Sequence, residues 1–338
     1  MKHEFQHLQA AHCENGVTSN LLKTIGVDKI TEPLTFGIGS GLFFVYVPFL
    51  KINKGPAIAF RTMPGLIFKR TCNSLNIPVV RKKFSSKESA DLFLQKCLQS
   101  GQPVGCQVGV YYLSYFPKEY RFHFNAHNII VFGKEDDRYL ISDPVMENVT
   151  SLSSYELERV RFAKGALAPR GQLYYPKEGT IVTDNHIRKA IETGIKRNVN
   201  HMLHIPGSIA GVKGIASTGN KIKKWRDKLG IKEAGLYLAQ LVRMQEEIGT
   251  GGGGFRYIYA AFLQQSHSYY SNDSLLEISK KFTLSGDMWR NAAVHAAGIY
   301  KGRIGSQSDF DIMGDYLIQI AELEKKAFQA LSKIKWNS

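Results

Sequence analysis

Apolar residues in the first half of the chain recur at helical spacing in two places. Residues 14–27 carry the first pattern, and Gly26 stands where such a helix would end. Residues 86–100 carry the second, with Ser86 at its start and Gly101 just beyond its end. We therefore expect two helices, with Cys13 at the N-terminal end of the first one.

Short runs of β-branched and aromatic residues follow the second predicted helix. They cover residues 103–113, 127–133 and 138–144, and acidic or glycine-containing turns separate them. An earlier run, residues 35–49, contains three spaced glycines and predicts a loop that enters a strand. Helices first and antiparallel strands afterwards are typical of an α+β domain.

The spacing changes beyond residue 184, where long amphipathic patterns replace the strand signals and predict an all-α region. These patterns cover residues 185–203, 233–249, 255–270 and 308–334. The intervening sequence YYPKEG at residues 174–179 marks a boundary. A chain of 338 residues is long enough for two domains, and we place them at residues 1–180 and 181–338.

Composition is that of an ordinary globular protein, with 43% hydrophobic and 22% charged residues. No apolar stretch approaches the length that spans a bilayer, and the first residues lack the apolar core of a secretion signal. The four cysteines form no CxxC pair and no zinc-ligand spacing. We therefore expect a cytoplasmic protein whose cysteines are reduced and one of which can act as a nucleophile.

The chain is strongly basic, with a formal net charge of +15. Residues 186–233 contribute much of this charge, since they hold eleven Lys or Arg against three acidic residues. Such a surplus favours an acidic partner, which could be a protein, a phosphorylated ligand, an anionic membrane surface or nucleic acid, or it is simply the solvated face of basic helices. No nucleic-acid-binding signature is present, so nucleic acid is not the expected partner.

Cys13, His127 and Asp143 are the candidate catalytic residues. A thiol at a helix N-terminus, beside an imidazole, is favoured as the reactive thiolate. His127 opens one predicted strand and Asp143 ends the next, sixteen residues later, so a hairpin would bring them together. The carboxylate would then orient the imidazole. The alternative is a buried structural cysteine, a histidine at a strand edge and an Asp-Pro turn.

Two further histidines are given lesser roles. His12 precedes the candidate nucleophile, but adjacent residues of an extended segment point to opposite sides, so we expect it to position the motif. His123 and His127 have a spacing that joins metal ligands on a helix, whereas this segment is a predicted strand. We expect no metal site.

The residues around the candidate triad resemble a known family. HCENGVTSNLL with TEPLTFGIGSGLFFVY, and HNIIVFG with SDPV, are similar to the N-terminal domain of butirosin biosynthesis protein H. The order of Cys, His and Asp also resembles that of the peptidases that trim leader peptides inside ABC transporters, and of papain-like enzymes generally. In the first family a helical domain often carries a motif similar to GTGGGGFRYIY at residues 249–259. The resemblance implies a papain-like fold followed by an all-α domain.

The resemblance also implies an activity, in which an acyl group passes from the phosphopantetheine thioester of an acidic acyl carrier protein, or from coenzyme A, to an amine or hydroxyl. The acceptor would be a small molecule or a lipid, and no cofactor would be bound. Cys13 would be acylated, His127 would act as base and then acid, and Asp143 would orient His127. Papain-like enzymes place an oxyanion-hole glutamine six residues before the cysteine, where this chain has His7. Gln6, Gln9 or the Cys13 backbone N–H would replace it.

Glycine-rich segments supply the candidate substrate-binding residues. Gly252 and Gly253 precede a predicted helix whose first amides could hold a phosphate, and Arg256 could add a charged contact. Tyr259 completes the motif. Gly39 and Gly41 could let the backbone approach a substrate. For both segments the alternative is a hinge, a shaped loop or close packing.

Two other functions remain open at this point. The same acyl-enzyme could pass its acyl group to water, which would make the protein a peptidase or an amidase. A basic binding module that keeps the papain-like shape, for example on anionic lipid, would need no reactive thiol. Nothing in the sequence indicates an oligomeric state.

Overall fold

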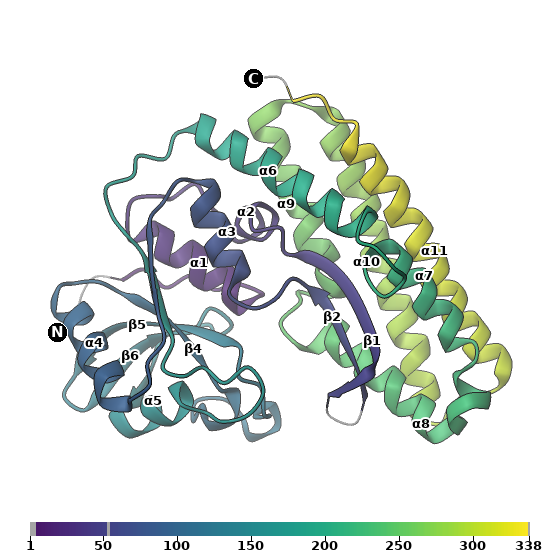
Figure 1. Cartoon of the computed structure of the whole chain (residues 1–338), viewed down its shortest axis with the longest axis horizontal. Helices are drawn as coiled ribbons and strands as arrows, with labels where there is room; N and C mark the ends of the chain where they lie inside the picture. The colour runs from purple at the N-terminus through teal and green to yellow at the C-terminus, as the bar shows by residue number, and fades with distance from the viewer. Residues whose placement is uncertain (1–4, 53–54, 337–338) are drawn as a thin grey trace. The chain divides into compact units, whose positions relative to one another are not determined.

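The computed structural model describes residues 5–52 and 55–336, which form two compact units (Figure 1). The first unit runs through Thr35 and resumes over Ile67–Thr183. The second unit consists of Phe36–Leu66 and of the chain from Asp184 onward.

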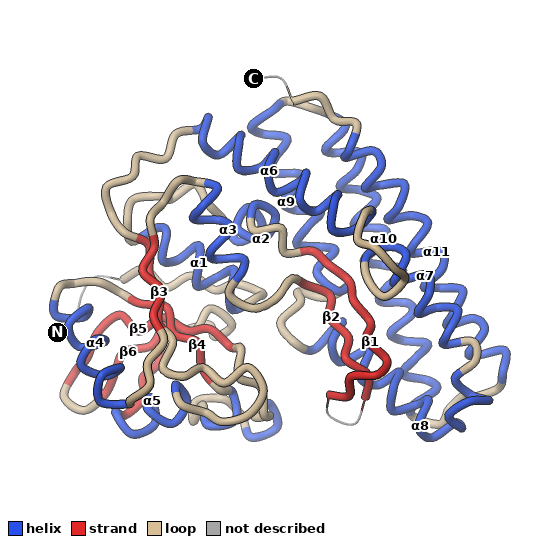
Figure 2. The backbone as a smooth tube through the Cα atoms, in the orientation of Figure 1, coloured by secondary structure: helices blue, strands red, loops and turns tan. Residues whose placement is uncertain are grey.

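The first unit is built on a six-stranded sheet in the order β3-β8-β4-β5-β6-β7, in which every neighbouring pair is antiparallel (Figure 2). The strands are β3 (Val79–Lys82), β4 (Val104–Val108), β5 (His127–Glu135), β6 (Arg138–Ser142), β7 (Thr150–Ser153) and β8 (Leu173–Pro176). Alternate residues of β4 and β5, such as Cys106 and Ile129, join a core with Leu94 and Val160 of two helices.

The helices of this unit are α1 (Cys13–Lys23), α3 (Leu66–Ser74), α4 (Lys87–Gln99) and α5 (Ser154–Arg161), while α2 (Glu32–Ile38) and α3 span the points where the two units join in sequence. Two short 3-10 turns, Val110–Tyr112 and Lys118–Tyr120, lie between β4 and β5. Helix α1 packs on β4, β5 and β8. As predicted, it ends before Gly26, whose φ of 78° is incompatible with a continued α-helix. Ser86 caps α4 by accepting the Ser89 N–H.

The second unit combines a two-stranded hairpin with a set of long helices. The hairpin is β1 (Leu42–Ile52) with β2 (Gly55–Arg61). The helices are α6 (Asp184–Leu203), α7 (Gly211–Ile222), α8 (Trp225–Val242), a π-helical turn (Arg243–Glu247), a 3-10 turn (Gly253–Phe255), α9 (Arg256–Tyr270), α10 (Asp273–Tyr300) and α11 (Gln307–Ser332). Helices α10 and α11 run side by side along this unit (Figure 1).

The hairpin departs from the expected division of the chain, because residues 36–66 group with the helices and we had placed them within residues 1–180. Aromatic packing explains the difference. Phe44 and Phe60 lie 6.0 and 5.0 Å from Trp289 of α10 between ring centroids, and 5.4 Å from each other. Their burial requires the helical unit, which a local strand pattern does not reveal.

The fold class follows the sequence prediction, with an α+β region of papain-like element order followed by helices. Residues 35–38, predicted as loop, belong to α2, and helices α2, α3, α5, α7 and α10 had not been predicted. Among the residues that the structure describes, no helix has both the length and the apolar character needed to cross a membrane.

Candidate active site

Cys13 is the first residue of α1 and is 7% exposed. His12 precedes it as the helix N-cap in an extended conformation, and its Nδ1 accepts the Asn15 N–H at 3.4 Å. His12 therefore positions the motif by capping the helix that carries the Cys13 thiol.

The segment before Cys13 is held from two sides. The Glu32 carboxylate of α2 accepts the Ala11 and His12 N–H groups at 3.0 and 2.8 Å. Burial raises the pKa of Glu32, and these two N–H groups oppose that rise. On the other side, the Ala10 N–H donates to the Pro144 carbonyl at 2.7 Å. Gly16 makes this approach feasible, since a Cβ there would lie 2.5 Å from Pro144.

His127 and Asp143 meet as the hairpin spacing predicted. His127 begins β5, Asp143 directly follows β6, and Nε2 of the imidazole lies 2.7 Å from Oδ2 of the carboxylate. The Cys13 side chain hydrogen-bonds the same imidazole. Because Nε2 faces Asp143, Nδ1 is left for the thiol. The structure thus brings the three candidate catalytic residues together.

The imidazole is buried, and the pKa of His127 depends on its two partners. Burial opposes the charged form, but the neighbouring Asp143 and Cys13 outweigh it and raise the pKa of His127 to about 10. The arrangement is that of a nucleophilic thiol beside an imidazole that a buried carboxylate orients.

Tyr115 is a member of this site that the sequence did not reveal. Its hydroxyl donates to Oδ2 of Asp143 at 2.9 Å, and the Val145 N–H donates to Oδ1 at 3.2 Å. Burial and the neighbouring carboxylate hold the pKa of Tyr115 well above its usual value, so the phenol stays protonated and donates. Asp143 therefore has three hydrogen-bond partners, His127, Tyr115 and the Val145 N–H, which hold its carboxyl group in place.

Comparison with known proteins places the chain in a family. A family model described as butirosin biosynthesis protein H, N-terminal, matches residues 12–144. A second model, described as a domain of unknown function (DUF4872), matches residues 155–331. The second model covers more than half of the chain, so the chain belongs to the family that this model describes, and its N-terminal part matches the butirosin biosynthesis protein H model. The resemblance to butirosin biosynthesis protein H seen in the sequence is confirmed.

A crystal structure described as a C39-like peptidase from Bacillus anthracis also matches, with 14% identity and a TM-score of 0.35, over 54% of this chain and 95% of that one. A search of curated proteins gave no match. The butirosin biosynthesis protein H family and the Cys13 site together support a papain-like cysteine enzyme.

The remaining thiols of this family member are buried in apolar surroundings. Burial raises the pKa of Cys72 to about 12 and that of Cys106 to about 11, and it also raises the pKa of Cys97. None of the three shares the imidazole partner of Cys13, so they are structural thiols.

The expected oxyanion donors are placed differently. Gln6 and Gln9 are exposed, and the structure gives neither a contact with Cys13. His7, at the position where papain-like enzymes have glutamine, is bound through both ring nitrogens, to the Ser142 hydroxyl at 2.8 Å and to the Met146 carbonyl at 3.1 Å. Asn128, which the sequence analysis overlooked, places its amide nitrogen 3.9 Å from the Cys13 sulfur.

Arg256 was expected to contact a substrate phosphate, and the structure gives it a different role. Its guanidinium is fully buried, forms a bidentate pair with Glu324 at 2.8 and 2.9 Å and donates to the Gly254 carbonyl at 2.7 Å. Ser285 and Trp289 donate to the same carboxylate. With its donors directed inward, Arg256 stabilises the helical unit and is unavailable to a phosphate.

The glycines of the same motif are also engaged in packing. The Gly252 N–H donates to the Thr250 hydroxyl and the Gly253 N–H to the Glu246 carboxylate. A Cβ at Gly254 would lie 2.5 Å from the Phe60 ring. The amides that we expected to cradle a phosphate are thus used inside the unit, and the close-packing alternative describes the motif.

Tyr259 and the earlier glycines follow the same pattern. Tyr259 is fully buried, with its ring 4.8 Å from that of Phe282, and burial alone raises its pKa. Gly39 and Gly41 are buried, and a Cβ at Gly41 would lie 2.3 Å from the Phe36 ring. The structure gives Tyr259 and Gly41 roles in packing, and the substrate contacts expected of these residues stay predictions.

Proposed function

We propose that the protein is a cysteine acyltransferase that takes an acyl group from a thioester donor, holds it on Cys13 and passes it to an amine or hydroxyl acceptor. The observation that carries the proposal is the convergence of the Cys13 thiol, the His127 imidazole and the Asp143 carboxylate at the start of α1 in a member of a biosynthetic family. The natural donor is the phosphopantetheine thioester of an acyl carrier protein.

The first half-reaction forms the acyl-enzyme. The Cys13 thiolate attacks the thioester carbonyl, and a tetrahedral intermediate forms. When it collapses, the bond between the carbonyl carbon and the donor sulfur breaks, and the departing thiolate takes the proton from the His127 imidazolium. The donor leaves as a free thiol, and His127 is left neutral while Asp143 still holds its ring.

The second half-reaction uses the neutral imidazole as a base. An acceptor amine attacks the acyl-Cys13 carbonyl and gives a proton to His127, and the intermediate collapses to an amide and the Cys13 thiolate. The starting charge pair is restored, and no external oxidant, reductant or metal is needed. Tyr115 and the Val145 N–H hold the Asp143 carboxylate in place through both steps.

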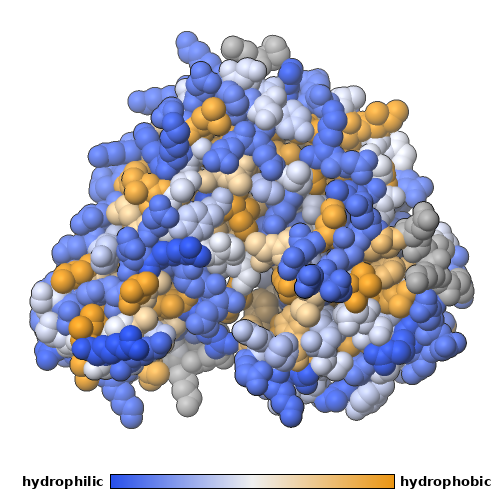
Figure 3. Space-filling view, turned by 180° about the vertical axis from the view of Figure 1, so that it is seen from behind, coloured by the Kyte–Doolittle hydropathy of each residue, from blue (hydrophilic) through white to orange (hydrophobic). Residues whose placement is uncertain are grey.

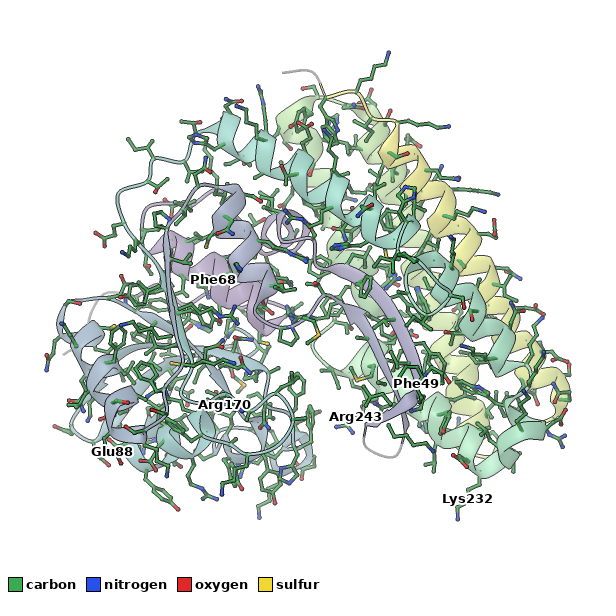
Figure 4. The ribbon with its side chains drawn as sticks, viewed as in Figure 1. Phe49, Phe68, Glu88, Arg170, Lys232 and Arg243 are labelled. Atoms are coloured by element: carbon green, nitrogen blue, oxygen red, sulfur yellow. The ribbon has the colours of Figure 1, made fainter. Side chains whose placement is uncertain are left out.

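The basic helical unit supports a carrier protein as the donor, because such carriers are acidic. Helix α8 exposes Lys228 and Lys232 next to two apolar side chains, Ile231 and Leu236, which are 51% and 53% exposed. Lys232, labelled in Figure 4, points away from the unit. The face of the molecule that Figure 3 shows is mostly hydrophilic with scattered apolar patches. Helix α8 is broken at Gly230, so these four residues lie on both sides of the break, and we propose this exposed stretch, residues 228–236, as the docking surface for the carrier.

Product analysis tests the proposal. Isotope-labelled acyl carrier protein is incubated with the enzyme and a panel of amines, and acyl-amine and free acid are separated by liquid chromatography and mass spectrometry. Acyl-amine formed by the wild type but not by Cys13→Ala, with Cys97→Ala as the matched control that keeps activity, supports transfer. Free acid formed at a rate that no amine changes would instead favour a peptidase or amidase. Equal products from wild type and Cys13→Ala would overturn the proposal.

A further inference from the structure

Asn128 directly follows His127 on β5, and both residues reach the same thiol. The His127 imidazole hydrogen-bonds Cys13, and Nδ2 of Asn128 lies 3.9 Å from Sγ. The sulfur therefore has both an imidazole and an amide N–H beside it.

The orientation of the Asn128 amide is fixed by its other contacts. Nδ2 lies 3.1 Å from the Ala126 carbonyl, which can only accept, so the nitrogen and not the oxygen must face that side. Oδ1 accepts the Tyr174 hydroxyl at 2.7 Å. One N–H of the amide is thus used by Ala126, and the second is directed toward Cys13. Asn128 is buried, with 3% of its surface exposed.

Tyr174 is held by its own surroundings. A Cβ on Gly105 of β4 would lie 2.5 Å from the Tyr174 ring, so glycine leaves the space in which the ring lies. On another side, the ring of Phe68, labelled on α3 in Figure 4, is 4.5 Å away between centroids. Burial, with the nearby Glu14 and Cys13, holds the pKa of Tyr174 well above its usual value. Its hydroxyl therefore stays a donor.

We propose that the Asn128 side-chain N–H is the oxyanion-hole donor of this enzyme, and that Tyr174 and Gly105 are positioning residues for it. The inference rests on the proposed acyl transfer. The oxyanion is borne by the carbon bonded to Sγ, and an effective donor lies about 2.7–3.1 Å from it. An amide nitrogen 3.9 Å from Sγ can reach an oxygen on the carbon that is bonded to this sulfur. The Cys13 backbone N–H, in the first turn of α1, is the second donor.

Two reactions of Cys13 separate this role from simple support of the thiol. Acylation by a thioester or a p-nitrophenyl ester passes through an oxyanion, whereas alkylation by iodoacetamide does not. We expect Asn128→Ala to lower the acylation rate by about 10²–10³-fold and to change the alkylation rate less than threefold. Asn128→Asp keeps the shape, loses the N–H donor and adds a carboxylate beside the thiol, so it should lower acylation as strongly and also slow alkylation to a smaller extent. Tyr174→Phe, which keeps the ring, should lower acylation about tenfold.

The results distinguish a failure of the oxyanion role of Asn128 from a failure of the proposed acyl transfer. If the wild type is acylated and Asn128→Ala, Asn128→Asp and Tyr174→Phe are acylated at the wild-type rate, the oxyanion role is overturned and the acyl transfer stands. If acylation and alkylation fall in parallel, Asn128 supports the thiolate and the inference is also overturned. If the wild type is acylated by neither reagent while iodoacetamide still labels Cys13, the proposed function fails and the inference with it.

Discussion

The Asp143 carboxylate lies 2.7 Å from Nε2 of His127 and has no exposed surface. Two segments of chain, the start of β5 and the residue after β6, are needed to make this contact, and it directs the opposite ring nitrogen to Cys13. A buried carboxylate in contact with an imidazole favours the imidazolium, and a thiolate beside it does the same. The chemistry of the site follows from this one relationship.

Asp143→Asn tests the orienting carboxylate. The amide keeps the shape but loses the charge, so it no longer stabilises the His127 imidazolium, and we expect kcat/KM for acyl transfer to fall by about 10²–10⁴-fold. Tyr115→Phe removes one hydrogen-bond donor to the same carboxylate and should lower kcat/KM about tenfold. Steady-state kinetics measure both. Wild-type rates in Asp143→Asn would contradict the assignment of Asp143.

The pH dependence of stability follows from His127. Its pKa in the folded protein is raised from 6.5 to about 10, so the folded state holds the proton more tightly than the unfolded chain. The stabilisation that the tighter proton binding of His127 gives the folded protein is full below pH 6.5, declines between pH 6.5 and about 10, and is lost above that range. The difference in unfolding free energy between wild type and His127→Gln should shrink over that window in denaturant titrations. A difference that is constant from pH 6 to 10.5 would contradict the coupling.

Removing the thiol should change the titration of the imidazole. The Cys13 thiolate helps to raise the pKa of His127, so Cys13→Ala should lower it. Histidine-selective NMR titrations of the two proteins give the comparison directly. Identical titration curves would show that thiol and imidazole are uncoupled.

Arg256 should contribute to the stability of the folded protein and not to the reactivity of the Cys13 thiol. Arg256→Met leaves the Glu324 charge buried without its partner, which should reduce the unfolding free energy by about 3–5 kcal/mol. Arg290→Met, at a guanidinium whose side chain is 61% exposed, is the matched control and should cost less than about 0.5 kcal/mol. Iodoacetamide labelling of Cys13 should be unchanged in both. An Arg256→Met protein of wild-type stability that binds the donor poorly would restore the substrate role.

The α8 docking surface is tested by charge reversal. Lys228→Glu with Lys232→Glu should raise KM for an acyl carrier protein about tenfold at low salt, and less at high salt, because ionic strength screens the attraction. Lys325→Glu with Lys326→Glu, on exposed residues of α11, changes the net charge equally and is the control. Equal effects of the two pairs would show that only net charge matters.

Local patterns predicted the parts of this site that depend on short stretches of chain. The helix behind Cys13 and the hairpin that joins His127 to Asp143 each lie within about twenty residues, where spacing and turn residues decide the structure. The roles of Tyr115 and Asn128 could not be predicted in this way. Each depends on a partner from a distant segment, Asp143 for the first and Cys13 and Tyr174 for the second.

The glycine motif at residues 249–259 is a case in which the local sequence predicted a site that distant partners rule out. Read locally, Gly252, Gly253 and Arg256 have the composition of a phosphate site. Glu324 lies 68 residues further along and neutralises the guanidinium, and Glu246 and Thr250 accept the amides. A backbone that is tightly packed against Phe60 also needs glycine. Close packing and anion binding select the same residues, and only the tertiary partners distinguish them.

The most direct test of the acyltransferase account is the mass of the protein after a brief incubation with acyl carrier protein that bears a defined acyl group. We predict one added acyl mass on the wild type, located on the peptide that contains Cys13, and its loss when an acceptor amine is added, with acyl-amine formed in equal amount. An adduct that Cys13→Ala also acquires, or an adduct on Cys72, Cys97 or Cys106 in place of Cys13, would contradict the account.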